Sequence, residues 1–284
     1  MSRPFRFGVN LLTPASADEW RAKCRRAEEL GYDVLLVPDH LGMPAPFPAL
    51  VAAAGATERP RLGTFVLNAG FWNPVLLARE VATTAALTGG RLELGLGTGY
   101  VQAEHDRAGL PFGSPRERVD HLQRTVEELL RSEGCRVPLL IGGNGDRMLR
   151  LTAEHADIAA FAGARLAPGN TEGRLEPVTA EELDERVARY EELAAGRGDA
   201  AERNLLVQIV AITDDPRSAL APFLDRRSEL TLEQALALPT VLVGALEEVA
   251  GRVRALRERY GFSYLTVLEP YMEAFAPVLA ELAT

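Results

Sequence analysis

The chain has 284 residues, of which 47% are apolar and 25% charged, a profile typical of a water-soluble globular protein with a sizeable core. No apolar run approaches the ~20 residues of a membrane-spanning helix, and the first residues lack a signal-peptide core, so we expect a cytoplasmic protein without membrane contact. The net charge of −9 and the lack of a basic patch argue against a nucleic-acid partner. Cys24 and Cys135 are expected to be separate thiols, not a disulfide.

Short apolar runs alternate with amphipathic segments along the whole chain. In order, the expected strands are 5–12, 34–37, 62–67, 92–97, 138–141, 158–161, 205–212 and 264–268. The expected helices are 16–30, 48–57, 74–87, 114–131, 146–155, 180–195, 244–260 and 272–282, with start signals such as Ser16 followed by Glu19, or Pro74. Residues 163–177 are expected to form a Gly/Pro-rich loop, and residues 216–238 irregular or short helical structure.

Eight strands, each followed by a helical segment, predict a single (β/α)8 TIM barrel over residues 1–284. The strands are almost continuously apolar, which is typical of parallel strands covered on both faces. A doubly wound open sheet is the alternative, but eight strands exceed its usual number. No linker divides the chain. In a barrel, the functional groups lie in the loops after the strands.

Two glycine-rich turns follow expected strands. The first, Gly97-Thr98-Gly99, ends the apolar run 92–97, and taken alone it is best explained as a tight turn. The second, residues 142–145 (GGNG), closes a strand and precedes a helix that carries Arg147. Backbone amides at such turns, together with Arg147, can hold an anion. Because the two strands are neighbours in a barrel, the pair favours a phosphate-bearing cofactor or substrate.

Polar residues at strand ends are the candidate reactive groups: Asn10, Asp39, His40, Asn68, Gln208 and Glu269. His40 directly follows a buried strand and could transfer a proton near neutral pH, with Asp39 fixing its tautomer or raising its pKa. The alternative is that Asp39 caps a turn while His40 only packs, and position alone leaves the two interpretations even. His105 could also face the barrel mouth, whereas His121 and His155 lie within helices.

The apolar walls of such a pocket could come from Tyr100, Phe71, Trp72 and Phe161, although ordinary packing explains these aromatic residues as well. No metal-ligand pattern appears in the sequence, and there is no G-x-S-x-G turn for a serine nucleophile. The only lysine, Lys23, lies within a helix, so a Schiff-base mechanism is not expected.

The sequence resembles the bacterial luciferase-like flavin- and F420-dependent oxidoreductases, a TIM-barrel superfamily. The likeness lies in residues 27–40 (AEELGYDVLLVPDH), 62–100, 109–123 (GLPFGSPRERVDHLQ), 138–158 (PLLIGGNGDRMLRLTAEHADI) and 239–270, and it is strongest toward the F420 branch. The resemblance implies a cofactor ring across the barrel mouth, its phosphate at the glycine turns, and His40 beside the ring as a proton-transfer residue. It also implies a non-proline cis peptide bond between Phe65 and Val66 behind the ring.

Carried over onto this chain, the resemblance and the strand-end positions give one set of expected cofactor contacts: Asn10, Phe65, Val66, Asn68, Gly97, Thr98, Gly99, Gly142, Gly143, Asn144, Gly145 and Arg147. The expected substrate contacts are Tyr100, Phe71, Phe161 and Glu269. Relatives are commonly homodimers, so a homodimer is expected.

The sequence also departs from the family pattern. Sugar-phosphate dehydrogenases of this family carry an acid where Tyr100 stands, and a tryptophan shortly after the histidine, where residues 41–44 read LGMP. Glucose-6-phosphate oxidation is therefore not expected. The short connection 131–137 replaces a longer insertion of many relatives, which predicts a more open pocket.

The sequence therefore predicts an F420-dependent oxidoreductase that transfers a hydride between the deazaflavin and a small organic substrate, most simply in reduction of a C=C or C=N bond. One alternative is an FMNH2-dependent luciferase-like monooxygenase, which the short connection 131–137 disfavours. The other is a non-catalytic flavin-binding paralogue.

Overall fold

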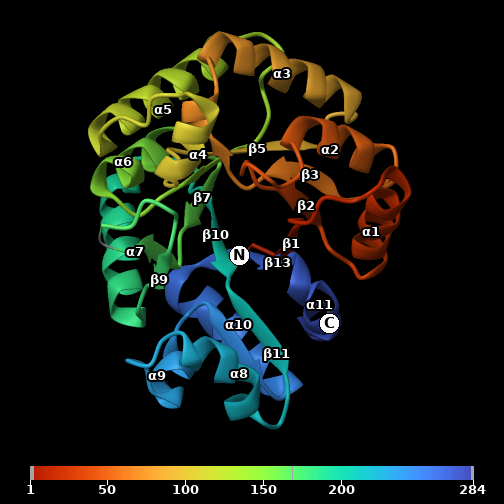
Figure 1. Cartoon of the computed structure of the whole chain (residues 1–284), viewed down its shortest axis with the longest axis vertical. Coiled ribbons are helices and arrows are strands. Elements are labelled where there is room, and N and C mark those ends of the chain that lie inside the picture. The colour runs from red at the N-terminus through yellow and green to blue at the C-terminus, as the bar shows by residue number, and fades with distance from the viewer. Residues whose placement is uncertain (1–2, 168, 283–284) are drawn as a thin grey trace.

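The structure, a computed structural model, describes residues 3–167 and 169–282, and its centre is a closed parallel β-barrel (Figure 1). Strand β1 pairs with both β2 and β13, and β3 pairs with β5, so the sheet closes on itself. The prediction of a (β/α)8 barrel is confirmed. Its eight strands are β1 (Arg6–Asn10), β2 (Val34–Val37), β3 (Arg61–Thr64), β5 (Leu92–Gly97), β6 (Leu139–Gly142), β7 (Ile158–Phe161), β10 (Glu202–Val207) and β13 (Phe262–Leu268).

Helices surround the barrel and begin where the sequence provides caps. Ser16, Ser114 and Thr179 each accept a hydrogen bond from the third helical residue in a complete capping box. The second helix begins at Pro46, two residues before its predicted start. The helices after the strands are α1 (Ala17–Glu29), α2 (Pro46–Ala54), α3 (Pro74–Leu87), α5 (Pro115–Arg131), α6 (Asp146–His155), α7 (Ala180–Ala194), α10 (Leu246–Tyr260) and α11 (Met272–Leu282).

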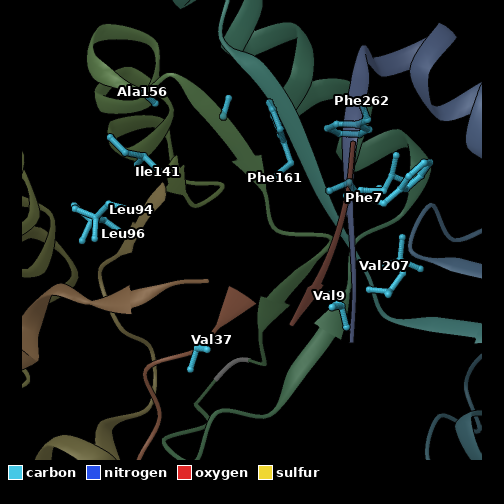
Figure 2. Packing of buried hydrophobic residues seen from close by; sticks show 14 of the residues in the cluster. Phe7, Val9, Val37, Leu94, Leu96, Ile141, Ala156, Phe161, Val207 and Phe262 are labelled. Atoms are coloured by element: carbon cyan, nitrogen blue, oxygen red, sulfur yellow. The ribbon is translucent and has the colours of Figure 1, made fainter. Parts of the chain in front are cut away.

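The strands are apolar on both faces because each face contacts a different core. The larger cluster lies between the barrel and the helices; Figure 2 shows part of it, including Phe7, Phe161 and Phe262. Phe161 and Phe262 pack edge to face with their ring centres 5.5 Å apart. A separate cluster that includes Leu36, Leu140, Ile158 and Tyr264 has Phe65 and Val66 packed against it. Burial on both faces explains the continuous apolar runs in the sequence.

Charged residues lie at the amino-terminal ends of the strands. Arg6 lies 2.5 Å from a carboxylate oxygen of both Glu93 and Glu202, and Arg61 binds Glu93 at 2.6 Å. The guanidinium of Arg6 also lies 4.7 Å from the ring centre of Tyr264. We call these four charged residues the basal ion network. It lies at the end of the strands opposite to the loops that carry the predicted site residues.

The structure departs from the prediction after the seventh barrel strand. The segment 205–212, expected as one strand, is divided at Gln208: β10 belongs to the barrel, whereas β11 (Ile209–Ile212) pairs with β12 (Val241–Gly244) outside it. Helices α8 (Pro216–Asp225) and α9 (Leu232–Ala237) pack on this pair around a small core of their own, which includes Leu220, Val241 and Val243. Figure 1 shows this subdomain to one side of the barrel.

Several short elements were not predicted as separate units. A hairpin of β8 (Ala164–Leu166) and β9 (Leu175–Pro177) forms within 163–177, and α4 (Gln102–Ala108) follows the first glycine turn. Residues 67–68 form β4 (Leu67–Asn68), which continues the line of β3 and is followed by the short helix η1 (Ala69–Phe71). A second short helix, η2 (Glu269–Tyr271), precedes α11.

Both cysteines are buried as free thiols, and burial raises the pKa of the Cys24 thiol to about 12. Within residues 3–167 and 169–282, no helix is long and apolar enough to cross a membrane.

Candidate active site

A cavity of about 540 Å³ opens at the carboxyl ends of the barrel strands, a volume typical of small-molecule sites. Most of the residues that the sequence places at strand ends meet here. The cavity is lined by Asn10, Asp39, His40, Phe65, Val66, Asn68, Gly97, Thr98, Gly99, Tyr100, Gly142, Gly143, Asn144, Phe161 and Gln208, among others. Six residues that the sequence suggested for this cavity do not line it: Phe71, Trp72, His105, Gly145, Arg147 and Glu269.

The peptide bond between Phe65 and Val66 is cis, as the resemblance implied. Both residues line the cavity, and the side-chain amide of Asn10 donates to the Phe65 carbonyl at 3.3 Å. The other side-chain atom of Asn10, Oδ1, is buried without a hydrogen-bond partner in the described chain. An unpartnered buried acceptor in a cavity wall is a position at which a ligand donor can bind.

The first glycine turn packs closely against neighbouring residues in the cavity wall. A Cβ atom at Gly97 would lie 2.7 Å from the Val66 side chain, and one at Gly99, where φ is +71°, would lie 2.2 Å from Asn68. Packing within the protein therefore already requires these glycines. Thr98 is the side chain that this turn presents to the cavity.

His40 is held by a carboxylate that the sequence analysis did not identify. Its Nδ1 atom lies 3.0 Å from both carboxylate oxygens of Glu104, on α4. Its Nε2 atom lies 3.4 Å from the Tyr100 hydroxyl, and the two rings meet edge to face at 5.5 Å. Burial raises the pKa of Tyr100, so the phenol stays protonated and can donate to Nε2. The row Glu104–His40–Tyr100 thus fixes one imidazole tautomer, with its proton on Nδ1.

Asp39 does not take the role that the sequence analysis assigned to it. Its Oδ2 atom accepts hydrogen bonds from the Asn68 backbone amide at 3.2 Å and from the Trp72 indole at 2.9 Å. Burial raises the pKa of Asp39, and these two hydrogen bonds oppose that rise. Asp39 therefore fixes the turn after β4, and Glu104 replaces it as the partner of the His40 Nδ1 atom.

His105 and Phe71 lie behind the cavity wall. His105 is fully buried, where its Nε2 accepts from the Asn68 amide at 2.9 Å and its Nδ1 donates to the Pro111 carbonyl at 3.1 Å. Phe71 packs against this ring with centres 4.9 Å apart. His105 therefore does not face the mouth, contrary to the prediction; Phe71 does not line the cavity, and its predicted substrate contact stays a prediction. The ring of Phe161, only 2% exposed, likewise packs edge to face on Tyr190 and Phe262.

Glu269 is also a structural residue. It accepts hydrogen bonds from the backbone amides of Leu12 and Thr13, at 2.5 and 2.8 Å, and it forms an ion pair with Lys23. These contacts join the end of β13 to the loop after β1. In this structure Glu269 therefore joins two elements and does not line the cavity, and its predicted substrate contact stays a prediction.

The second glycine turn contributes its backbone to the cavity. The side-chain amide of Asn144 donates a hydrogen bond to the Ala162 carbonyl, and its oxygen accepts one from the Ala162 backbone amide. Residues 142–144 therefore hold a fixed position on the cavity wall. Gly145 is the N-cap of α6 and provides no side-chain cap. Arg147 pairs with Asp120 at 2.5 Å on the outside of the barrel. The amides of the first turn of α6 are thus open to an anion, whereas Arg147 is engaged by Asp120 and does not line the cavity.

The sequence profile of the family described as luciferase-like monooxygenase matches residues 1–264. The chain belongs to this family.

Among curated luciferase-like relatives, the chain is 27% identical over 171 residues to the 5,10-methylenetetrahydromethanopterin reductase of Archaeoglobus fulgidus, covering 54% of this chain and 51% of that protein. It is 38% identical over 117 residues to the F420-dependent glucose-6-phosphate dehydrogenase of Intrasporangium calvum, covering 37% of this chain and 35% of that one. It is 29% identical over 123 residues to the oxygenase component of a flavin-dependent trigonelline monooxygenase of Acinetobacter baylyi, covering 41% and 34%. The chain thus matches about half or less of the length of these relatives.

Solved structures share the fold over nearly the whole chain. An F420-dependent secondary alcohol dehydrogenase in complex with an F420–acetone adduct superimposes with a TM-score of 0.78, at 15% identity and with 99% of both chains covered. The F420-dependent tetrahydromethanopterin reductase of Methanopyrus kandleri gives a TM-score of 0.72, at 18% identity and 97% coverage of both chains.

The luciferase-like site of this chain fits a flat ring that carries a phosphate. The partly apolar wall, which includes Phe65 and Val66, suits a ring, and the open amino-terminal end of α6 beside Gly143 suits a phosphate. The unpartnered Oδ1 of Asn10 suits a ring N–H. In the described ranges, no group of three or more His, Cys, Asp and Glu side chains could hold a metal ion.

Proposed function

We propose that the protein is an F420-dependent oxidoreductase acting on a small organic substrate, in reduction of a C=C or C=N bond or in the reverse oxidation. The observation that carries this proposal is the row Glu104–His40–Tyr100 at the rim of a cavity that fits a ring and a phosphate. The F420-dependent enzymes among the relatives support it.

The residues present would hold the cofactor at two parts of the cavity. Phe65, Val66 and Asn10 would hold the ring, and Thr98 with the first amides of α6 would hold the phosphate. Bound F420 supplies the hydride from its deazaflavin ring. What the protein adds is position, exclusion of water and a proton at a defined atom.

His40 is the group that moves this proton. Because Glu104 engages Nδ1, the nitrogen that faces Tyr100 is Nε2, and both His40 and Tyr100 line the cavity. Neutral His40 accepts a proton at Nε2, and protonated His40 donates it from there, with the charge balanced by the Glu104 carboxylate 3.0 Å away. Tyr100 can pass a proton between Nε2 and a substrate that does not reach the imidazole.

The charges around the cavity favour an uncharged substrate. Its described ionisable lining residues include Asp39, Glu104 and one arginine, Arg165. That arginine already pairs with both Glu176 and Glu182, so it provides no free cation for a substrate phosphate. Sugar-phosphate dehydrogenases of the family carry an acidic residue where this chain has Tyr100. This difference and the lack of a free cation argue against a sugar phosphate as substrate.

A screen of activated alkenes and imines with reduced F420, followed by deazaflavin absorbance, tests the proposal. We expect His40→Gln to lower turnover about 10²–10⁴-fold with unchanged F420 affinity, because a proton-transfer group is lost. Glu104→Ala should lower turnover by on the order of 10²-fold, because the imidazole is no longer held in place. Asp106→Ala, an exposed change on the same helix, is the matched control.

Full turnover in His40→Gln with a substrate found in the screen would contradict the assigned role. Oxygen consumption with reduced FMN, and none of the F420 reactions, would instead support the luciferase-like monooxygenase alternative.

A further inference from the structure

A second cavity, of about 310 Å³, adjoins the first. The two share Ala164, Leu175 and Gln208 in their walls. The second cavity lies where the β8–β9 hairpin meets the subdomain of β11, β12, α8 and α9, which Figure 1 shows beside the barrel. Neither the cofactor nor the proton-transfer row of the proposed function uses it.

The charge that lines this cavity is positive. Its ionisable lining residues other than tyrosine are Glu176, Arg226 and Arg227. Glu176 pairs with Arg165 at 3.5 Å and forms no ion pair with Arg226 or Arg227 in the described chain. Arg227 donates to the Leu175 carbonyl, and Arg226 forms no ion pair with any residue that the structure describes. Two guanidinium charges therefore lie at the cavity without a carboxylate partner, and they favour an anion.

A buried hydroxyl also lacks a partner in this wall. Thr240 is 1% exposed, and its Oγ1 makes no hydrogen bond within the described chain. Its methyl group packs directly against Gly163: a Cβ atom added to that glycine would lie 1.9 Å from the Thr240 methyl carbon. Its carbonyl is fixed as well, since it accepts from the amides of Gln208 and Ile209 at 2.8 and 3.2 Å. A held hydroxyl that lacks a partner is a ready contact for a ligand.

The rest of the wall is apolar, with Ile209, Phe223, Leu238 and Val241 among its residues. An occupant therefore needs an apolar body as well as an anionic end. At about 30 Å³ for each water-sized group, the volume suits roughly ten non-hydrogen atoms.

A carboxylate suits this site better than a phosphate does. Arg226 is the C-cap of α8, so the helix presents its partially negative end here. Phosphates are held more often by amides at helix amino termini, and this cavity has none from α8.

We propose that this second cavity is a binding site for a carboxylate with a short apolar chain, held at its charged end by Arg226 and Arg227. The site is separate from the cofactor cavity, and the proposal does not depend on F420 binding.

The test is calorimetric titration of the full chain, without cofactor, with octanoate and with the uncharged 1-octanol. Octanoate has ten non-hydrogen atoms and one carboxylate. We expect it to bind with a dissociation constant on the order of 1 mM, and 1-octanol to bind at least about tenfold more weakly.

Three variants locate the site. Arg226→Gln should weaken octanoate binding about tenfold, whereas Arg217→Gln, an exposed change on the same helix, should leave it unchanged. Ala219→Phe keeps both arginines but fills the cavity, so it should abolish binding; its thermal transition shows whether it is folded. If Ala219→Phe does not fold, Arg226→Gln decides alone.

Equal affinity for octanoate in the wild type and Arg226→Gln would overturn the proposal, as would the absence of octanoate binding. If octanoate competed with F420 and its affinity did not change in Arg226→Gln, octanoate would bind in the first cavity. That result would overturn the proposal too. Failure of F420 to bind would count against the proposed function alone.

Discussion

At the scale of single residues, sequence neighbours have different tasks. His40 turns toward Glu104 and Tyr100, whereas Asp39 turns toward Asn68 and Trp72. Adjacent residues after a strand leave it in different directions, so proximity in sequence does not give the hydrogen-bond partner. The sequence indicated that His40 is a reactive group, but the carboxylate that holds it comes from a helix 64 residues further along.

The first prediction concerns Asp39. Both of its hydrogen bonds end on one oxygen, so Asp39→Asn keeps an acceptor for them, whereas Asp39→Ala leaves two donors unmet. We expect Asp39→Ala to lower the free energy of unfolding at pH 7 by about 1–3 kcal/mol and Asp39→Asn to leave it nearly unchanged. Urea denaturation measures both. Equal losses in the two variants would contradict the assigned hydrogen bonds.

The raised pKa of Asp39 also makes the unfolding free energy depend on pH. The folded state binds the Asp39 proton more tightly than the unfolded chain does, in which this carboxyl titrates near pH ~3.9. The protonated carboxyl therefore adds to the unfolding free energy below that pH, and this contribution is lost as the pH rises through the folded pKa. The unfolding free energy of the wild type should therefore fall relative to Asp39→Asn as the pH rises above ~4. A difference that is independent of pH would contradict the raised pKa.

At the scale of elements, the sequence predicted the regular units and missed the short ones. Segments such as 34–37, 74–87 and 146–155 match the observed elements because burial on both faces, proline or a cap marks their limits. Helix α4 has seven residues and no side-chain cap, so no signal marked it, and Glu104 was missed with it. The subdomain after β10 was missed because Gln208 interrupts an apolar run that reads as one strand.

The second prediction concerns Glu269, which joins the end of β13 to the loop after β1. Hydrogen bonds and the ion pair with Lys23 lower its pKa against the opposing effect of burial, so its contribution is present above the unfolded pKa and is lost as the pH falls through the folded value. Glu269→Gln should lower the unfolding free energy by about 1–3 kcal/mol at pH 7, less at pH 3. Glu273→Gln, which breaks an exposed pair with Arg26, should cost under about 1 kcal/mol.

Thermal and urea unfolding at both pH values measure these differences. If Glu269→Gln instead changed substrate affinity without changing stability, the residue would belong to the site after all.

At the scale of the whole molecule, the stabilising ion pairs and the candidate active site lie at opposite ends of the barrel. The basal ion network occupies the amino-terminal ends of the strands, and both cavities lie toward the other ends. The sequence predicted the barrel from its eight repeats, together with most of the cavity lining. It could not predict the basal ion network, because Arg6, Glu93 and Glu202 are far apart in the chain and meet only when the barrel closes.

The third prediction concerns this network. Arg6→Met removes the cation between two largely buried carboxylates, so we expect a loss of about 3–5 kcal/mol in unfolding free energy at pH 7. Adding Glu202→Gln should recover part of that loss, because one uncompensated charge is removed. Arg25→Met, on the exposed face of α1, is the control. If Arg6→Met and Arg25→Met lowered the unfolding free energy equally, the basal ion network would add nothing to stability.

The central claim is that the first cavity binds a deazaflavin. The most direct measurement is a fluorescence titration of the purified protein with F420 and, separately, with FMN. We expect micromolar binding of F420, weaker binding of FMN, and unchanged F420 affinity in His40→Gln. Tight binding of FMN without any response to F420 would contradict it.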